Sequence, residues 1–356
     1  MSVFYATLVS TYISYFLARI AYEKKYRLIA IMFSIIVALI LIFVSGLRNG
    51  IGDTGMYMHS YKILVQNPVM PKDGKDIGFS MISLLLIPIS SDPQILIFVV
   101  ALITNLFNVI SFNKYKSYLE LQVYMYITSG YYIVTMNGIR QCLAAALLFM
   151  CVPLIIRGKF KVYCILVVII SMFHGSALML IPIYFIVREE AWSKKVIIFI
   201  ILGMVCVLLY DVVSPIFFKA LESTQYAEYS DYDGGGSSFM RVVVNAVPVI
   251  LSYLKRKELK EVWSESNVFV NMSIINTMFV AAGMFNWIFN RFTLYLQLYN
   301  FVLIPFIIKN CFKGREKRLI YFTFIICYFI FFYYEQVIGM NMSYPTNFNL
   351  KDLILN

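Results

Sequence analysis

The sequence carries little charge for its length. Only 14% of its 356 residues are Asp, Glu, Lys or Arg, whereas a soluble chain carries about 25%. Apolar residues make up 61%, and the mean hydropathy is +0.77. A helix needs about 20 mostly apolar residues to cross a bilayer, and runs of this kind occur from one end of the chain to the other. These properties exclude an ordinary soluble protein and predict a polytopic membrane protein.

Residues that usually bind metals or perform hydrolysis are also scarce. There are two histidines, His59 and His174, and six cysteines, which form no CxxC pair. The sequence contains no HExxH, P-loop, GxSxG or dinucleotide motif. We therefore predict no cofactor, no metal site and no disulfide, and neither ATP-driven transport nor hydrolase chemistry is supported. The pI of about 9.2 reflects membrane orientation here and does not indicate nucleic-acid binding.

The long, continuous apolar runs predict helices and not barrel strands. The first run, 3–22, lacks a basic start and an A-x-A-like cleavage site, so we interpret it as the first span and not as a signal peptide. The expected fold is all-α, with one integral membrane domain over 1–356 and about twelve spans. Segment 77–91 is short and contains Pro88; it either crosses or re-enters the membrane, and we favour re-entry. The predicted spans are 3–22, 28–47, 94–112, 119–135, 138–156, 161–173, 176–187, 195–211, 240–254, 268–289, 292–309 and 318–335.

Basic residues are distributed unevenly between the two faces that this topology defines. With 77–91 re-entrant, 21 of the 30 Lys and Arg residues fall on one face. Cytoplasmic loops carry such an excess, so this face is predicted to be cytoplasmic and both termini external. The two long external loops are 48–76 and 212–239. The second ends in EYSDYDGGGSSF, which forms either a lid over a polar substrate or a solvated tether.

Cysteine labelling tests this orientation. We expect Gly235→Cys to react with a membrane-impermeant maleimide in intact cells, because position 235 lies in an external loop. Lys257→Cys should react only after the membrane has been opened, because its loop belongs to the basic face. Labelling at position 257 but not at 235 would overturn the orientation, and with it the external site described next.

The external face carries only nine basic residues, and four of them are arginines at the mouths of apolar segments. The positive-inside rule disfavours basic residues at these positions. The four side chains either snorkel to lipid phosphates or converge on a shared anion, since intramembrane charge usually faces the bundle interior. These residues are Arg48, Arg140, Arg241 and Arg291.

The stretch TMNGIRQCLAAALL predicts an anion site at the start of a helix. Asn137 and Gly138 fit a helix beginning, with Asn137 as the N-cap. The N–H groups and the helix dipole favour an anion there. Arg140 and Gln141, in the first turn, direct further donors to the same place. Such a site can bind a phosphate or diphosphate without a metal.

Two titratable side chains could activate a hydroxyl group at this face. Asp53 lies in GLRNGIGDTGMY, directly after an apolar run and close to Arg48. His174 interrupts an apolar stretch in SMFHGSAL, where it is either functional or a hydrogen-bonded structural residue. A metal site made of both histidines and Asp53 has only weak support.

Five motifs, RNGIGDTGMY, DIGF, NGIRQ, FHGSALMLIPIY and NRFTLYL, occur in this order between Arg48 and Tyr295. The series resembles the EpsG family of Wzy-type polymerases, which make bacterial exopolysaccharide, capsule and O-antigen. The resemblance implies a multi-pass enzyme of the cytoplasmic membrane. It would transfer a growing glycan from polyprenyl (undecaprenyl) diphosphate to a lipid-linked repeat unit on the outer side of the membrane. A chain-length regulator protein is an expected partner. One departure concerns Gly52, which directly precedes Asp53 where the family usually has an intervening residue.

The resemblance assigns roles to matching residues, and the expected chemistry agrees. A lipid diphosphate is a good leaving group, so arginines in a water-poor site can stabilise its charge without a metal or a general acid. Asp53 is the expected acceptor base, and His174 is the alternative base or orients the diphosphate. Tyr57 is expected to contact sugar. The expected diphosphate-binding residues are Arg48, Arg140, Arg291, Asn137 and Gln141, with Arg241 added from the topology alone.

Two other classes of protein share parts of this pattern. A flippase for lipid-linked sugars would also bind diphosphate with arginines, but it should show internal repeats and a charged path through the midplane. The sequence shows no repeat, and its polar motifs gather on one side. An O-antigen ligase, or another polyprenyl-phosphate glycosyltransferase, would share the external arginines and a carboxylate.

Overall fold

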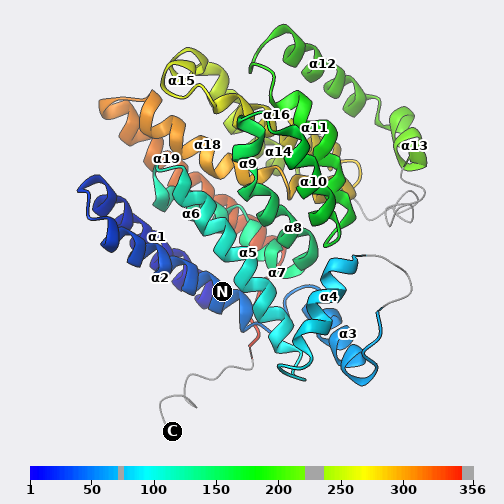
Figure 1. Cartoon of the computed structure of the whole chain (residues 1–356). Helices are drawn as coiled ribbons and strands as arrows, with labels where there is room; N and C mark the ends of the chain where they lie inside the picture. The colour runs from blue at the N-terminus through cyan, green and yellow to red at the C-terminus, as the bar shows by residue number, and fades with distance from the viewer. Residues whose placement is uncertain (71–75, 221–235, 347–356) are drawn as a thin grey trace. The chain divides into compact units, whose positions relative to one another are not determined.

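The computed structural model describes residues 1–70, 76–220 and 236–346 (Figure 1). Its regular elements in these ranges are helices, and no β-strand occurs among the described residues. The all-α prediction is therefore confirmed. A helix pairs backbone N–H and C=O groups within one segment, which a lipid environment demands. The described chain falls into two compact units, one built from 1–154, 161–179 and the segment after Cys311, the other from 155–160 and 180–311. The expectation of a single domain stays a prediction.

The first unit is organised by three long helices, α1 (Ser2–Glu23), α2 (Arg27–Gly46) and α5 (Gln94–Lys114). The α1 and α2 helices run side by side, and α5 packs against α2 (Figure 1). Small and hydroxyl side chains line the buried stripe of α1, including Thr7, Thr11 and Ala18, and such residues let helices approach closely in membranes. The other elements are α3 (Thr54–Gln66), α4 (Ile77–Leu86), α6 (Leu119–Thr128), α7 (Tyr131–Asn137), α8 (Ile139–Met150), η1 (Gly175–Met179), α19 (Gly314–Phe332) and the π-helix η3 (Tyr333–Gly339).

In the second unit, α16 (Ser266–Ala282) contacts most of the other helices. Polar side chains join it to its neighbours: Asn276 Nδ2 donates to Asn245 Oδ1 at 2.8 Å, and Thr277 Oγ1 donates to the Asn245 carbonyl at 2.7 Å. Such interhelical hydrogen bonds help to hold membrane helices together. The other helices are α11 (Leu180–Val187), α12 (Lys194–Leu208), α13 (Tyr210–Ala220), α14 (Phe239–Leu254), α15 (Arg256–Val262), α17 (Ile288–Thr293) and α18 (Gln297–Cys311), while α9 (Val152–Ile156) and α10 (Phe160–Ser171) belong to the stretch where the chain passes between units.

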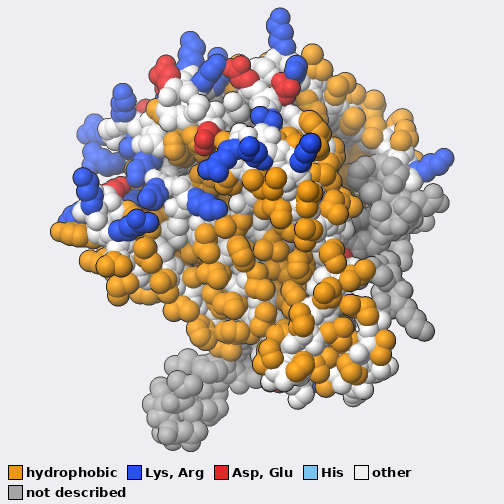
Figure 2. All heavy atoms as spheres, in the orientation of Figure 1, with side chains coloured by type: hydrophobic (Ala, Val, Ile, Leu, Met, Phe, Trp, Pro, Cys, Tyr) orange, Lys and Arg blue, Asp and Glu red, His pale blue; other side chains and the backbone are white. Residues whose placement is uncertain are grey.

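Four helices in the described ranges are long and apolar enough to cross a membrane: α1, α2, α5 and the segment Gly314–Gly339. The α12 helix qualifies as a fifth only together with Tyr210–Ile216, and the two pieces are bent by 97°. Several further apolar helices are 10–17 residues long. Most exposed side chains on the face shown in Figure 2 are apolar. The multi-pass helical character is confirmed, whereas the count of about twelve spans is not.

Several predicted spans are interrupted. The predicted span 119–135 divides into α6 and α7 at Gly130, whose φ of +80° ends the first helix. Spans 138–156 and 195–211 divide at Cys151 and Leu209. The prediction of continuous helices was wrong at these positions, because apolar composition does not report a backbone break. The α4 helix has ten residues, or about 15 Å. It is therefore too short to cross a hydrocarbon core of about 30 Å. A short helix of this kind is what the predicted re-entry of 77–91 requires.

The two predicted external loops contain helices. The α3 helix lies within 48–76, and most of α13 lies within 212–239. Residues 71–75 and 221–235, which include most of the predicted lid, lie outside the described residues.

The C-terminal end of α2 is capped by side chains. The last carbonyl groups of a helix have no intrahelical partner. Here each carbonyl oxygen from residue 44 to residue 48 accepts a hydrogen bond from a side chain, and two donors come from nearly 300 residues away. The Tyr344 hydroxyl donates to the Val44 carbonyl at 2.6 Å, the Arg48 guanidinium to the Ser45 carbonyl, and the Thr346 hydroxyl to the Leu47 carbonyl at 2.7 Å. The Gln94 amide donates to two carbonyl groups, those of Gly46 at 2.6 Å and Arg48 at 3.0 Å. The loop after α2 is thereby anchored.

Candidate active site

Arg140 is the centre of the candidate site. It lies in the first turn of α8, and its Nη1 contacts Asp76 Oδ2 at 2.6 Å. Its Cζ lies 5.6 Å from the centre of the Tyr57 ring, a cation–π contact. The charge of Asp53 also favours the Arg140 cation. The Arg140 side chain remains 32% exposed, although its Nε atom is buried.

Asp76 was not assigned a role from the sequence, although it begins the DIGF motif. Its side chain is 5% exposed and faces Arg140. Its backbone is left-handed, with φ +48°, a conformation that Asp tolerates better than most residues. Its carbonyl oxygen accepts from the N–H groups of Phe79 and Ser80, which starts α4. The one available signal was that Asp76 and Asp53 are the two acidic residues in the five motifs of the family.

Asp53, at the start of α3, is exposed and joined to Asn137. The Asp53 N–H donates to Asn137 Oδ1 at 2.9 Å. The expectation that Asn137 caps α8 was wrong, because α7 continues through Asn137 and Gly138 takes the N-cap position. The Asn137 side chain instead holds the turn before α3. The structure thus brings Asp53, Tyr57, Asn137 and Arg140 together.

The turn before Asp53 requires a glycine. Gly52 has φ +52°, and a Cβ atom there would lie 2.3 Å from Asn137 Oδ1. We expect Gly52→Ala to lower the free energy of unfolding by about 1–3 kcal/mol through backbone strain. For the activity that the motif resemblance implies, we expect it to reduce polymer yield by displacing Asp53. Gly55→Ala is the matched control, because a Cβ at Gly55 meets nothing within 4 Å. Thermal unfolding of the purified proteins and glycan chain length measure both effects. Equal behaviour of the two variants would contradict this role of Gly52.

Arg48 is buried, with 1% of its surface exposed. Its Nη2 donates to the Met136 carbonyl at 2.7 Å, its Nε to Thr54 Oγ1 at 3.0 Å, and its Nη1 to the Ser45 carbonyl. Burial lowers the pKa of Arg48 to about 10, so the group stays cationic at neutral pH. The cation therefore lies against the C-terminal ends of α2 and α7, where helix dipoles favour positive charge. These contacts direct the guanidinium toward protein acceptors.

Gln141 and His174 are linked through a serine that the sequence analysis did not single out. Gln141 Nε2 donates to Ser176 Oγ at 3.2 Å, and Ser176 Oγ lies 2.7 Å from His174 Nδ1. All three side chains are buried. The η1 turn places Ser176 two residues after His174, so the FHGSAL motif folds back on the first turn of α8.

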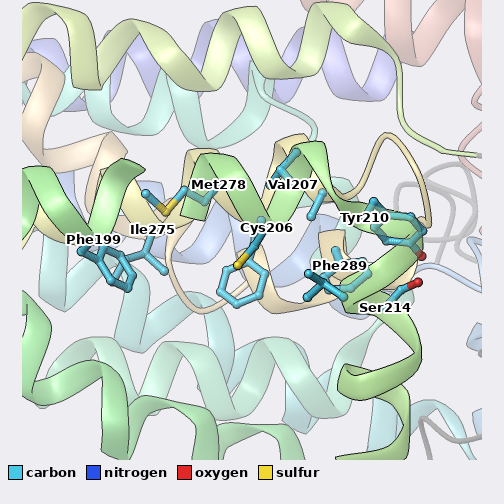
Figure 3. Close-up of a pocket in the computed structure, with 11 residues that line it drawn as sticks. Phe199, Cys206, Val207, Tyr210, Ser214, Ile275, Met278 and Phe289 are labelled. Atoms are coloured by element: carbon cyan, nitrogen blue, oxygen red, sulfur yellow. The ribbon is translucent and has the colours of Figure 1, made fainter. Parts of the chain in front are cut away.

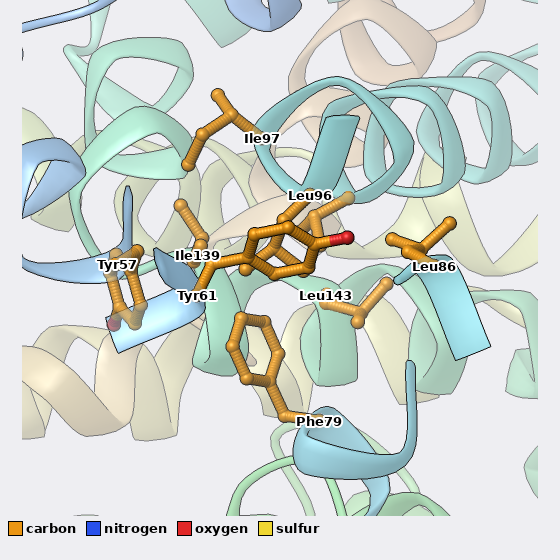
Figure 4. Packing of buried hydrophobic residues seen from close by; sticks show 9 residues of the cluster. Tyr57, Tyr61, Phe79, Leu86, Leu96, Ile97, Ile139 and Leu143 are labelled. Carbon is orange, nitrogen blue, oxygen red and sulfur yellow. The ribbon is translucent and has the colours of Figure 1, made fainter. Parts of the chain in front are cut away.

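A cluster of buried side chains from α3, α4, α5 and α8 includes Tyr57 (Figure 4), the ring that contacts Arg140. Tyr57 and Phe79 pack with ring centres 5.7 Å apart. The Tyr61 hydroxyl donates to the Ser90 carbonyl at 2.8 Å. The other members are Leu86, Leu96, Ile97, Val100, Ile139 and Leu143. This packing holds two helices against α8: α3, which carries Tyr57, and α4, which begins directly after Asp76.

Arg241 and Arg291 belong to the second unit. Arg241 lies in the first turn of α14, and Arg291 lies in the last turn of α17, with its Cζ 5.0 Å from the centre of the Trp287 ring. Convergence of the four external arginines on one anion stays a prediction. Within the described ranges, no group of three or more His, Cys, Asp or Glu side chains is arranged to hold a metal ion.

Helices that are long and apolar enough to cross a bilayer, together with several shorter apolar helices, define a multi-pass membrane protein. Residues 31–346 match the EpsG family, and the chain belongs to this family. The resemblance found in the motifs is thus confirmed. Membership indicates a bacterial membrane polysaccharide polymerase that acts on lipid-linked oligosaccharides. No curated protein and no solved structure matches the chain.

Proposed function

We propose that this protein is a metal-independent glycosyltransferase that polymerises oligosaccharide repeat units linked to a polyprenyl diphosphate. The reaction takes place on the outer face of the cytoplasmic membrane. The observation that carries the proposal is Arg140, a partly exposed arginine side chain in the first turn of α8. It presents planar donors where the helix N-terminus also favours an anion. The diphosphate of the donor lipid fits this place.

Asp76 and Tyr57 hold Arg140 in position. A guanidinium with one carboxylate partner and an aromatic ring beside it keeps its orientation before substrate binds, so little reorganisation is needed in the reaction. Diphosphate oxygens then engage the remaining N–H donors of Arg140. The negative charge that develops as the anomeric C–O bond breaks is stabilised by a preformed cation.

Asp53 is the proposed acceptor base. Its carboxylate is exposed, its backbone is held by Asn137, and its charge acts on Arg140. An exposed carboxylate near the diphosphate site can accept the proton of a sugar hydroxyl as that oxygen attacks the anomeric carbon. His174, linked to Ser176, is the alternative base. Arg48 stabilises the site by donating hydrogen bonds to the Met136 carbonyl and the Thr54 hydroxyl, which join the segments that carry Asn137 and Asp53.

Glycan chain length in a deletion strain tests the function. A polymerase deletion should lose long polymer but still export single repeat units, and the wild-type gene should restore the polymer. Loss of all outward units would indicate a flippase. Polymer made by the purified protein in the presence of a chelator would support metal independence, whereas restoration only by a divalent cation would contradict it.

A further inference from the structure

The second unit contains an apolar cavity of about 290 Å³ at the bend between α12 and α13 (Figure 3). The chain turns by 97° at Leu209, so the two short helices diverge instead of continuing as one rod. The α16 and α17 helices form the other walls. Lining residues from the four helices include Phe199, Cys206, Val213, Met278 and Phe289.

The cavity is polar at one end only. Figure 3 shows the hydroxyl groups of Tyr210 and Ser214 near each other at this end, and Phe199 at the opposite end. The side chains of Ser214 and Asn286 lie close to the Tyr210 hydroxyl, and the Tyr210 ring stacks on Phe285 with ring centres 5.0 Å apart. An occupant must therefore be apolar along its length, with its polar group near Tyr210.

The surroundings identify the chemistry of the occupant. The α12–α13 pair is apolar enough to count as a membrane span, so hydrocarbon surrounds it. Apolar cavities hold water poorly, and a hydrocarbon chain can enter from the bilayer. Moving a hydrocarbon chain from the bilayer into the cavity gives no hydrophobic gain, because both surroundings are apolar. Selectivity for one kind of chain must therefore come from close packing. Aromatic rings and the flexible Met278 thioether pack well around an irregular, methyl-branched chain.

We propose that this cavity binds part of the isoprenoid chain of the lipid-linked substrate, with the phosphorylated end directed toward Tyr210. The inference rests on the proposed function for the identity of the lipid. It assigns to the second unit a lipid-recognition site that is separate from the charged groups around Arg140.

Cys206 provides a native probe, because it lines the cavity and is an exposed residue. We would alkylate the purified full-length protein in detergent with N-ethylmaleimide and measure modification by mass spectrometry. Cys327, an exposed thiol on α19, is the internal control. Undecaprenyl phosphate at ten times its dissociation constant should slow alkylation of Cys206 about tenfold by mass action and leave Cys327 unchanged. Phosphatidylglycerol at the same concentration should protect neither thiol.

Two results would overturn the proposal. Equal protection of Cys206 by phosphatidylglycerol would make the cavity a general acyl-chain site, and no protection by undecaprenyl phosphate would exclude an isoprenoid chain. Neither assay depends on polymer formation, so the cavity and the proposed function can fail separately.

A pair of neighbouring variants tests the cavity in the working enzyme. Val213→Trp fills it, whereas Val212, next in sequence, is 65% exposed and does not line it. Val213→Trp should abolish protection of Cys206 and raise the KM for the lipid-linked donor, with kcat retained. Val212→Trp should leave both unchanged. Normal protection in Val213→Trp would overturn the assignment.

Discussion

Asp53→Asn is expected to remove nearly all polymer formation while the protein still binds its lipid-linked donor. Asparagine keeps the size of the side chain and one acceptor oxygen but cannot accept a proton at neutral pH. Loss of a general base typically costs about 10²–10⁴ in rate. Donor affinity should be unchanged or tighter, because Arg140 remains and a negative charge near it has been removed. Donor binding and polymerisation are measured on the same purified variant in lipid.

Asp76→Asn is the informative comparison for Asp53→Asn. It leaves the exposed carboxylate in place but removes the ion pair at 2.6 Å that orients Arg140. We expect lower thermal stability, weaker donor binding and a slower reaction together, because the guanidinium loses its fixed orientation. Asparagine also tolerates the left-handed backbone at this position, so the change isolates the charge. Retained donor binding with no polymer in Asp76→Asn, and normal activity in Asp53→Asn, would make Asp76 the base.

Arg140→Lys is expected to lower polymerisation about 10²–10³-fold, comparable to losing one donor in an oxyanion-type site. Lysine keeps the positive charge but presents a compact ammonium in place of a planar set of N–H donors. It cannot contact Asp76, lie over Tyr57 and engage a diphosphate in the same geometry. Single-turnover rates and donor affinity in reconstituted membranes measure the loss.

Arg157→Lys is the matched control, because Arg157 is an exposed arginine in a short connection between helices. It should polymerise at the wild-type rate. Full activity of a correctly inserted Arg140→Lys protein would show that only the charge at position 140 matters, and the proposed diphosphate site would fail.

The sequence predicted the helical class and several members of the site because these depend on local patterns. Long apolar runs demand helices in a membrane. Polar residues at their ends, such as Asp53, Asn137 and Arg140, mark one region. The structure does bring these three residues together with Tyr57.

Other features depend on contacts between distant residues, which spacing does not reveal. The Arg140–Asp76 pair joins positions 64 residues apart, through a left-handed turn at Asp76. Asn137 has a strong preference for helix caps, but α7 extends through it and its side chain reaches the turn before α3. Likewise, the sequence predicts that Arg48 binds the diphosphate, but it does not reveal that carbonyl groups at the ends of α2 and α7 accept hydrogen bonds from its guanidinium.

The capped end of α2 also has a consequence for biosynthesis. The ribosome completes Val44 and Leu47 about 300 residues before it adds Tyr344 and Thr346, whose side chains bond to those two carbonyl groups. Until then, the carbonyl groups of Val44 and Leu47 at the end of α2 lack these two hydrogen bonds, while α3, α7 and α8 are already made. The Arg48 loop is therefore among the last parts of the first unit to reach its final form. A nascent chain released before residue 344 would contain every charged group of the candidate site, yet would hold the loop that leads to Asp53 less firmly.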